Sequence, residues 1–152
     1  TIRSGAYETA LFKRDHNLQI ITSACPLFVP LVENGYTSRD NQVTKIVAEE
    51  YLAPLKAANV DTLILGCTHY PIIKELIGDI MGDKVTLIDS GLEVAAVAQS
   101  MLEEKGLLNL TKKIGDCHYF VSDSATDFTA SAAIILSDNK IENAIKIDIE
   151  SY

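Results

Sequence analysis

The sequence predicts an α/β fold built on a largely parallel sheet with flanking helices. Two observations lead to this prediction. Short apolar runs alternate along the chain with longer segments in which apolar residues recur at helical spacing. The runs in the middle of the chain are almost wholly apolar, as expected for strands that are buried on both faces. Strands that alternate with helices in this way are typical of parallel sheets, because parallel strands need long crossover connections.

We expect five strands. The last of them alternates strictly, with Ile145, Ile147 and Ile149 on one face, and is therefore predicted to be a half-exposed edge strand. The five predicted strands are Leu18–Thr22, Thr62–Leu65, Val85–Ile88, Tyr119–Val121 and Ala144–Ile149.

Four helices are expected between these strands. Pro54 should kink the first helix or make it end and restart. Pro71 lies at the start of the second, where its missing N–H costs nothing. The apolar faces are Val43, Ile46, Val47 and Tyr51 for the first helix, Ile72, Ile73, Leu76, Ile77 and Ile80 for the second, Val94, Val97, Ala98, Met101 and Leu102 for the third, and Phe128, Ala132 and Ile135 for the fourth.

The amino-acid composition argues against several classes of protein. The 152 residues are 47% hydrophobic and 22% charged, which is normal for a globular domain. The formal net charge of −8, without a cluster of basic residues, argues against nucleic acid as the main partner. No apolar run approaches the roughly 18 residues of a membrane span. Three cysteines without paired spacing predict neither a disulfide framework nor a metal site, and favour a reducing cytoplasm.

The sharpest candidate site follows the second predicted strand, in "LILGCTHY". Ligands of open parallel sheets bind outside the carboxyl ends of strands. Cys67 follows the strand and precedes a helix, whose N-terminal N–H groups and dipole favour the thiolate. Thr68 offers a hydroxyl to an anionic group, and His69 can hold or relay a proton. The alternative is a buried structural thiol beside a capping threonine and a surface histidine.

The other candidates favour ordinary structural roles. Cys25, just before Pro26, and Cys117, just before the fourth predicted strand, are interpreted as structural thiols. Glu33 is interpreted as a solvated carboxylate, although beside a cleft it would orient a histidine. Asp89 and Ser90 are expected to cap the following helix.

At these residues the sequence resembles the glutamate racemases of the aspartate/glutamate racemase superfamily. "LILGCTHYP" looks like the second catalytic-cysteine motif of the family. Supporting segments occur along the chain in the family's order, on both sides of this motif, so the resemblance covers nearly the whole chain. They are "TIRSGAY", "ACPLFVPLVENG", "VTLIDSG" and "YFVSDSATDF".

The resemblance implies two similar α/β lobes that close over glutamate, and racemisation without pyridoxal phosphate or metal. Two cysteines would face the α-carbon from opposite sides, one accepting a proton as thiolate and the other donating one. Residue by residue, the resemblance implies that Cys67 is the second catalytic cysteine, that His69 assists it and that Glu33 supports His69. Thr68 would contact the substrate carboxylate, and Thr1 would be a further substrate contact.

The Cys-Asn-Thr motif of the family's first catalytic cysteine does not occur in these 152 residues, and the resemblance implies that it lies in a segment ahead of Thr1. By this analogy, residues 1–88 form a lobe carrying the second catalytic cysteine, and residues 89–152 return to complete the other lobe. From the residues alone, a boundary at 103–116 is equally plausible. The expected partners are glutamate and the missing N-terminal segment, with a second copy in a homodimer as a further candidate; neither nucleic acid nor a membrane is expected.

Three alternatives remain open at the level of sequence. One is a racemase of the same superfamily that acts on aspartate or another small acid. Another is a non-catalytic α/β binding module. The third is a hydrolase with a cysteine nucleophile, which would form an acyl-enzyme and need an oxyanion hole. In the leading interpretation, the protein makes D-glutamate for peptidoglycan.

Overall fold

The computed structural model describes residues 2–111, 115–136 and 144–151, which are arranged in two compact units, Thr1–Asp89 and Ser90–Tyr152. Each unit contains a pair of parallel strands with helices beside it. The predicted α/β class with parallel strands and flanking helices is therefore confirmed. The strands form two separate two-stranded sheets.

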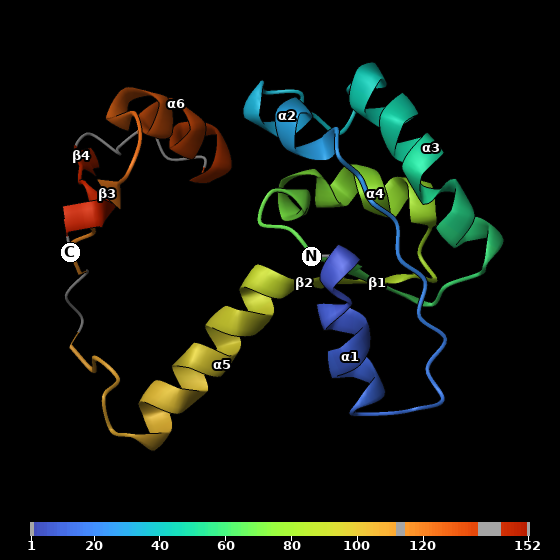
Figure 1. Cartoon of the computed structure of the whole chain (residues 1–152), viewed down its shortest axis with the longest axis horizontal. Helices are drawn as coiled ribbons and strands as arrows, with labels where there is room; N and C mark the ends of the chain where they lie inside the picture. Colours follow the sequence, from blue (N-terminus) through green and yellow to red (C-terminus); the bar gives the residue numbers. More distant parts are fainter. Residues whose placement is uncertain (1, 112–114, 137–143, 152) are drawn as a thin grey trace. The chain divides into compact units, whose positions relative to one another are not determined.

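The first unit is built around strands β1 (Thr62–Leu65) and β2 (Thr86–Asp89), which pair in parallel from Thr62 opposite Thr86 to Leu65 opposite Asp89. Figure 1 shows α3 and α4 on one side of these strands and α1 on the other. The helical elements of this unit are η1 (Ile2–Ser4), α1 (Ala6–Phe12), α2 (Phe28–Glu33), α3 (Gln42–Ala57), η2 (Tyr70–Ile73) and α4 (Lys74–Met81).

The hydrophobic core of this unit joins α2, α3, η2 and α4 to the inner face of β1. Leu65 from β1 is 2% exposed, and the helices contribute side chains that are buried to a similar degree. This core orients the end of β1 relative to the surrounding helices. Its buried members are Cys25, Phe28, Val32, Ala48, Leu52, Leu55, Leu65, Ile73, Leu76, Ile77, Ile80 and Met81.

Helix α3 differs from one of the two predicted outcomes at Pro54, namely that the helix ends and restarts there. The helix neither ends nor restarts there but continues to Ala57. The missing N–H of Pro54 frees the carbonyl of Glu50. Both residues are exposed, so water can satisfy that carbonyl and the interruption is tolerated.

The buried face of α3 also differs from the predicted one. Val43 and Ile46 are 49% and 63% exposed, whereas Thr44 is fully buried. Thr44 donates its hydroxyl to the carbonyl of Tyr36 at 2.7 Å, and its N–H donates to the side chain of the N-cap residue Asn41 at 3.0 Å. These bonds satisfy the polar groups of Thr44, so its burial does not leave an unpaired donor or acceptor. The buried stripe is Thr44, Ala48, Leu52 and Leu55.

The predicted strand Leu18–Thr22 is wrong, because the structure assigns no strand to these residues. Leu18 and Ile21 are 41% and 45% exposed. A strand needs a neighbour to pair with, and this segment has none in the part of the chain that the structure describes. Just after this segment, the hydroxyl of Ser23 donates a hydrogen bond to the carbonyl of Tyr51 in α3 at 2.8 Å, which holds the chain against that helix.

The second unit contains α5 (Ser90–Glu104), β3 (Tyr119–Val121), α6 (Ala125–Leu136), β4 (Ala144–Lys146) and η3 (Ile149–Ser151). Strands β3 and β4 pair in parallel, and the ring of Phe128 in α6 lies 5.8 Å from that of Tyr119. The last strand is shorter than predicted, because the chain turns into η3 and Ile149 leaves the expected alternation.

Helix α5 forms where it was predicted, but none of its side chains is buried. Its apolar face is exposed, with Val94 at 68% and Val97 at 59%. The helical spacing of apolar residues therefore predicted the helix correctly, but it did not predict whether that apolar face is buried. Among the described residues, no helix combines the length and apolar character needed to cross a membrane.

Candidate active site

The site begins where β1 ends, at Gly66. Its N–H donates to the carbonyl of Ile64 at 3.0 Å, which turns the chain away from the strand. A Cβ atom at this position would lie 3.3 Å from the ring of Tyr7 in α1. Glycine therefore lets α1 pack closely against the turn that presents Cys67.

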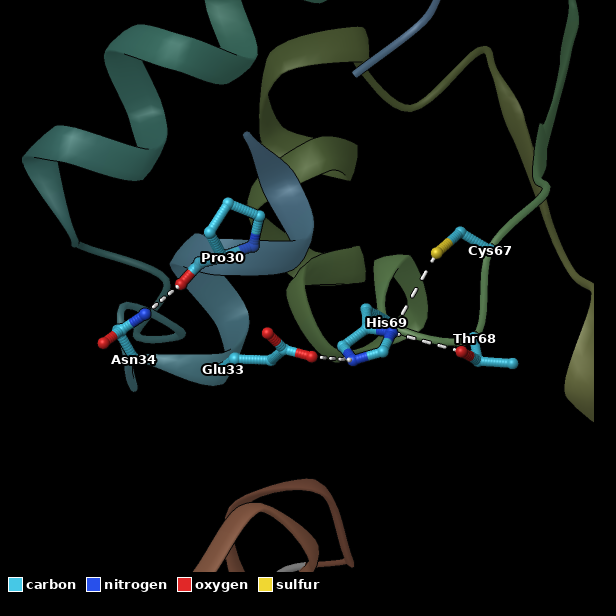
Figure 2. A network of polar contacts seen from close by, with 6 residues as sticks. All are labelled: Pro30, Glu33, Asn34, Cys67, Thr68 and His69. Atoms are coloured by element: carbon cyan, nitrogen blue, oxygen red, sulfur yellow. Dashed lines mark hydrogen bonds and ion pairs between the residues drawn. The ribbon is translucent and has the colours of Figure 1, made fainter. Parts of the chain in front are cut away.

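The next three residues gather their side chains around one nitrogen atom of His69 (Figure 2). Cys67 Sγ lies 4.0 Å from His69 Nδ1, and Thr68 Oγ1 lies 3.1 Å from the same atom. Cys67 is half-buried, whereas Thr68 is exposed. The thiol and the hydroxyl thus share one imidazole partner at the surface of the unit.

Glu33, the last residue of α2, holds the other side of the imidazole (Figure 2). Its Oε1 lies 3.3 Å from His69 Nε2, and the two side chains are 50% and 21% exposed. A carboxylate only accepts hydrogen bonds, so it favours the proton on Nε2 and leaves Nδ1 of the neutral ring as an acceptor. In that tautomer, the lone pair of Nδ1 faces the thiol and the hydroxyl.

A cluster of three aromatic rings sets the position of α2. Phe28 is 1% exposed and makes edge contacts with Tyr51 of α3, at 5.5 Å between ring centroids, and with Tyr70 of η2, at 5.2 Å. The hydroxyl of Tyr70 donates to the carbonyl of Cys25 at 3.1 Å. These contacts join the turn that carries His69 to the helix that carries Glu33.

Tyr70 is a residue of the site that local sequence patterns do not single out. Burial, with further contributions from the nearby thiols of Cys25 and Cys67, raises the pKa of its phenol to about 12. The signal available in the sequence was an aromatic residue directly after His69 and before Pro71. That signal does not identify its partner, which is 45 residues away.

The structure brings four of the predicted site residues together: Cys67, Thr68, His69 and Glu33. Thr1, the fifth, lies outside the described residues.

The two other cysteines lie outside this group of contacts. Cys25 is buried among core residues, and its burial raises the pKa of its thiol above the ordinary value. Cys117 is exposed and lies just before β3 in the second unit.

The contacts around His69 form a path for a proton. A thiol proton can pass to Nδ1 while the carboxylate of Glu33 stabilises the imidazolium through Nε2. Among the residues that the structure describes, no three His, Cys, Asp or Glu side chains are grouped so that they could hold a metal ion. A hollow of about 490 Å³ lies elsewhere in the unit, between α3 and α4, and is lined by Lys45, Glu49, Ala53, Lys56, Asp79 and Ile80.

Curated proteins similar to this chain include several glutamate racemases. The protein from Geobacter metallireducens is 47% identical over 128 residues, which cover 84% of this chain and 47% of that protein. The protein from Thermoanaerobacter sp. (strain X514) is 37% identical over 152 residues, which cover 100% of this chain and 56% of that protein. The chain thus spans about half the length of the curated relatives it matches. No family model matches it.

Solved structures show the same similarity. Glutamate racemase from Francisella tularensis, determined in complex with D-glutamate, has a TM-score of 0.87 and 36% identity, and the match covers 100% of this chain and 56% of that one. Glutamate racemase isoform RacE1 from Bacillus anthracis has a TM-score of 0.84 and 33% identity, with 98% and 54% covered. The similarity lies in the C-terminal portion of these relatives.

Proposed function

Because the chain is a homologue of the C-terminal portion of glutamate racemases, we propose that it supplies one half of the catalytic machinery of a glutamate racemase. The observation that carries the proposal is the sequence of contacts Cys67–His69–Glu33 at the carboxyl end of β1. A thiol with a histidine partner, itself oriented by a carboxylate, is suited to proton transfer.

In the proposed reaction, Cys67 acts on one face of the substrate α-carbon. As thiolate, it takes the α-proton of one enantiomer, so that a C–H bond breaks and an S–H bond forms. In the opposite direction, the thiol returns its proton to the carbanion. His69 supports both directions because Nδ1 can hold the proton that the thiol releases. Glu33 stabilises the imidazolium that results.

Inversion needs a second acid or base on the opposite face of the carbanion. We assign this role to a thiol in the part of the racemase that precedes this chain, since relatives extend over about twice its length. Two thiols supply both the acid and the base, so the proposed reaction requires no cofactor. By the same proposal, residues 89–152 complete a lobe whose remainder belongs to that preceding part.

Thr68 is proposed to bind a carboxylate of glutamate, because its hydroxyl is exposed beside the thiol. Thr1 is proposed as a further substrate contact. The D-glutamate bound to the Francisella tularensis relative supports glutamate as the ligand. A cytoplasmic location, a role in making peptidoglycan precursors and assembly into a homodimer belong to the same proposal.

The test is made on the complete protein that contains this chain. Replacing the thiol, Cys67→Ala, should lower racemisation of both glutamate enantiomers by about 10²–10⁴-fold, the usual contribution of a general acid or base. Optical rotation measures racemisation, and exchange of the α-proton in D₂O measures the proton-transfer step. Cys117→Ala, which removes an exposed thiol of the other unit, should retain full activity.

The same measurements separate the alternatives. Unchanged turnover in Cys67→Ala would rule out the catalytic role of this thiol. Activity on aspartate but not on glutamate would identify a different racemase of the superfamily. Exchange of neither substrate, combined with binding of glutamate, would identify a non-catalytic binding module.

A further inference from the structure

The nitrogen Nδ1 of His69 has two neighbouring donors but only one lone pair. Thr68 Oγ1 is 3.1 Å away, within ordinary hydrogen-bonding distance, whereas Cys67 Sγ is 4.0 Å away, at the limit for sulfur. Glu33 favours the proton on Nε2, so Nδ1 of the neutral ring can accept one hydrogen bond in its plane. In this structure the threonine hydroxyl has the shorter approach.

A hydroxyl carries one proton and two lone pairs, so it donates in one direction while it accepts from others. When Thr68 donates to Nδ1, it stabilises the neutral imidazole and occupies the lone pair that would receive the proton of Cys67. When the hydroxyl donates its proton to another acceptor instead, its oxygen can accept a hydrogen bond from a protonated Nδ1. It then stabilises the imidazolium instead.

We propose that the Thr68 hydroxyl is a switch that couples binding of the substrate carboxylate to deprotonation of Cys67. Without ligand, the hydroxyl proton points to His69 Nδ1 and the thiol keeps its proton. A bound carboxylate draws the hydroxyl proton to itself, because a hydrogen bond to an ionised acceptor is stronger than one to a neutral nitrogen. This inference rests on the proposed function, in which Thr68 contacts the substrate carboxylate.

The proton balance of the switch is simple. The hydroxyl keeps its proton throughout and only rotates. The S–H bond of Cys67 breaks, its proton forms an N–H bond at Nδ1, and the new N–H donates to the oxygen of Thr68 or to the thiolate. Glu33 compensates the positive charge of the ring through Nε2. The thiolate therefore forms mainly when a substrate is present to use it.

The charged and titratable groups around the switch are compatible with this coupling. On the side of α2, Glu33 contacts the ring. On the side of η2, the phenol of Tyr70 donates to the carbonyl of Cys25, and burial raises its pKa to about 12, so it stays neutral at physiological pH. The thiol of Cys25 is also kept protonated by its burial. Among the described residues of this unit, Glu33 is therefore the charged side chain that contacts the imidazole of His69.

The experiment compares alkylation of Cys67 in variants of the complete, ligand-free protein at pH 7. The variant Thr68→Val keeps the shape of the side chain but removes the hydroxyl, so Nδ1 is left to the thiol. We expect iodoacetamide to modify Cys67 about 2- to 10-fold faster than in the unsubstituted protein, the range that corresponds to one hydrogen bond. Mass spectrometry of the peptide containing Cys67 measures the rate. Thr68→Ser, which retains the hydroxyl, should behave like the unsubstituted protein.

A second pair of variants shows whether the effect passes through the histidine. In a His69→Asn background, Thr68→Val should leave the alkylation rate unchanged. An equal or slower rate for Thr68→Val alone would overturn the switch. So would an acceleration that persists without His69.

A separate experiment tests the effect of the ligand. D-glutamate is added to the complete protein, and the ¹⁵N NMR signals of the His69 ring are measured. Addition of D-glutamate should move the signal of Nδ1 toward that of a protonated nitrogen in the unsubstituted protein and in Thr68→Ser, but not in Thr68→Val. A shift of equal size in Thr68→Val would contradict the coupling. Alkylation of the ligand-free protein does not depend on turnover, so failure of the racemase assay and failure of the switch are seen separately.

Discussion

At the scale of single residues, the imidazole of His69 is the centre of the site. It has a contact at each nitrogen, with Glu33 at Nε2 and with the hydroxyl and the thiol at Nδ1. Thr68 and Cys67 are neighbours in the sequence, but Glu33 arrives from another helix. The carboxylate favours the tautomer with the proton on Nε2, and a preferred tautomer is what directed proton transfer requires.

Glu33→Gln tests the contribution of this carboxylate. The amide keeps nearly the same shape but loses the charge that stabilises the imidazolium. A hydrogen bond to a charged group is worth about 1.5–3 kcal/mol, and the half-exposed position of Glu33 places the effect at the lower end. We therefore expect racemisation by the complete protein to fall by about tenfold.

Glu49→Gln, an exposed position on α3, is the matched control and should leave the rate unchanged. Partial recovery in Glu33→Asp would support a role in orienting His69. If Glu33→Gln retained full activity, the ion pair would be a surface contact without a catalytic consequence.

At the scale of elements, the short helix α2 depends on its surroundings. A helix of six residues is marginal by itself. It is anchored by Phe28 and Val32, which are 1% and 0% exposed, and by the bond between Tyr70 and the carbonyl of Cys25. Packing, rather than helix propensity, therefore places Glu33 beside His69.

Tyr70→Phe removes only the hydroxyl of that bond and keeps the edge contact with Phe28. We expect the free energy of unfolding at pH 7 to fall by about 1 kcal/mol, as for a typical hydrogen bond. Denaturant titration measures this loss. Tyr36→Phe, at a tyrosine that is 41% exposed, is the control and should cost less.

The same variant tests the pH dependence of stability. The pKa of Tyr70 is raised from 10.0 to about 12 on folding, so the folded state holds this proton more tightly than the unfolded state. Its contribution is complete below pH 10 and is lost as the pH rises toward about 12. In the unsubstituted protein, absorbance at 295 nm should include a component that ionises near pH 12, and Tyr70→Phe should lose that component. Identical titration curves would contradict this assignment.

At the scale of the whole molecule, the two units differ in how much apolar surface they bury. The first unit has a connected core, whereas the described residues of the second include one buried hydrophobic side chain, Ala132. Helix α5 has none. Because packing provides most of the stability of helices in proteins, the two units should resist opening to different degrees.

Amide hydrogen exchange on the 152-residue chain should show this difference. We expect amides in α4 to exchange at least roughly tenfold more slowly than those in α5, since local opening is easiest where few apolar contacts are broken. Mass spectrometry of peptides from the two helices measures the rates. Equal protection would mean that the apolar face of α5 is covered in solution.

Local patterns in the sequence determined the elements near the site. The apolar run Thr62–Leu65, the glycine after it and Pro71 before the next apolar face predicted a strand, a turn and a helical start, and the structure contains all three. The same patterns drew attention to Cys67. For Glu33, the residues alone favoured a solvated carboxylate, and only the family resemblance implied that it supports His69, because no local pattern connects the two.

Tertiary structure determined the contacts that the spacing of residues within one segment does not predict. In the described part of the chain, Leu18–Thr22 has no neighbouring strand to pair with, so it does not form a strand. Hydrogen bonds to Tyr36 and Asn41 allow Thr44, rather than Val43, to face the core. The contact between Glu33 and His69, and the bond that joins Tyr70 to Cys25, link residues far apart in the chain. The sequence by itself determined that a thiol, a hydroxyl and an imidazole would follow a buried strand. Only the packing of α2 against η2 decided which carboxylate the imidazole meets, because that depends on side chains buried between elements.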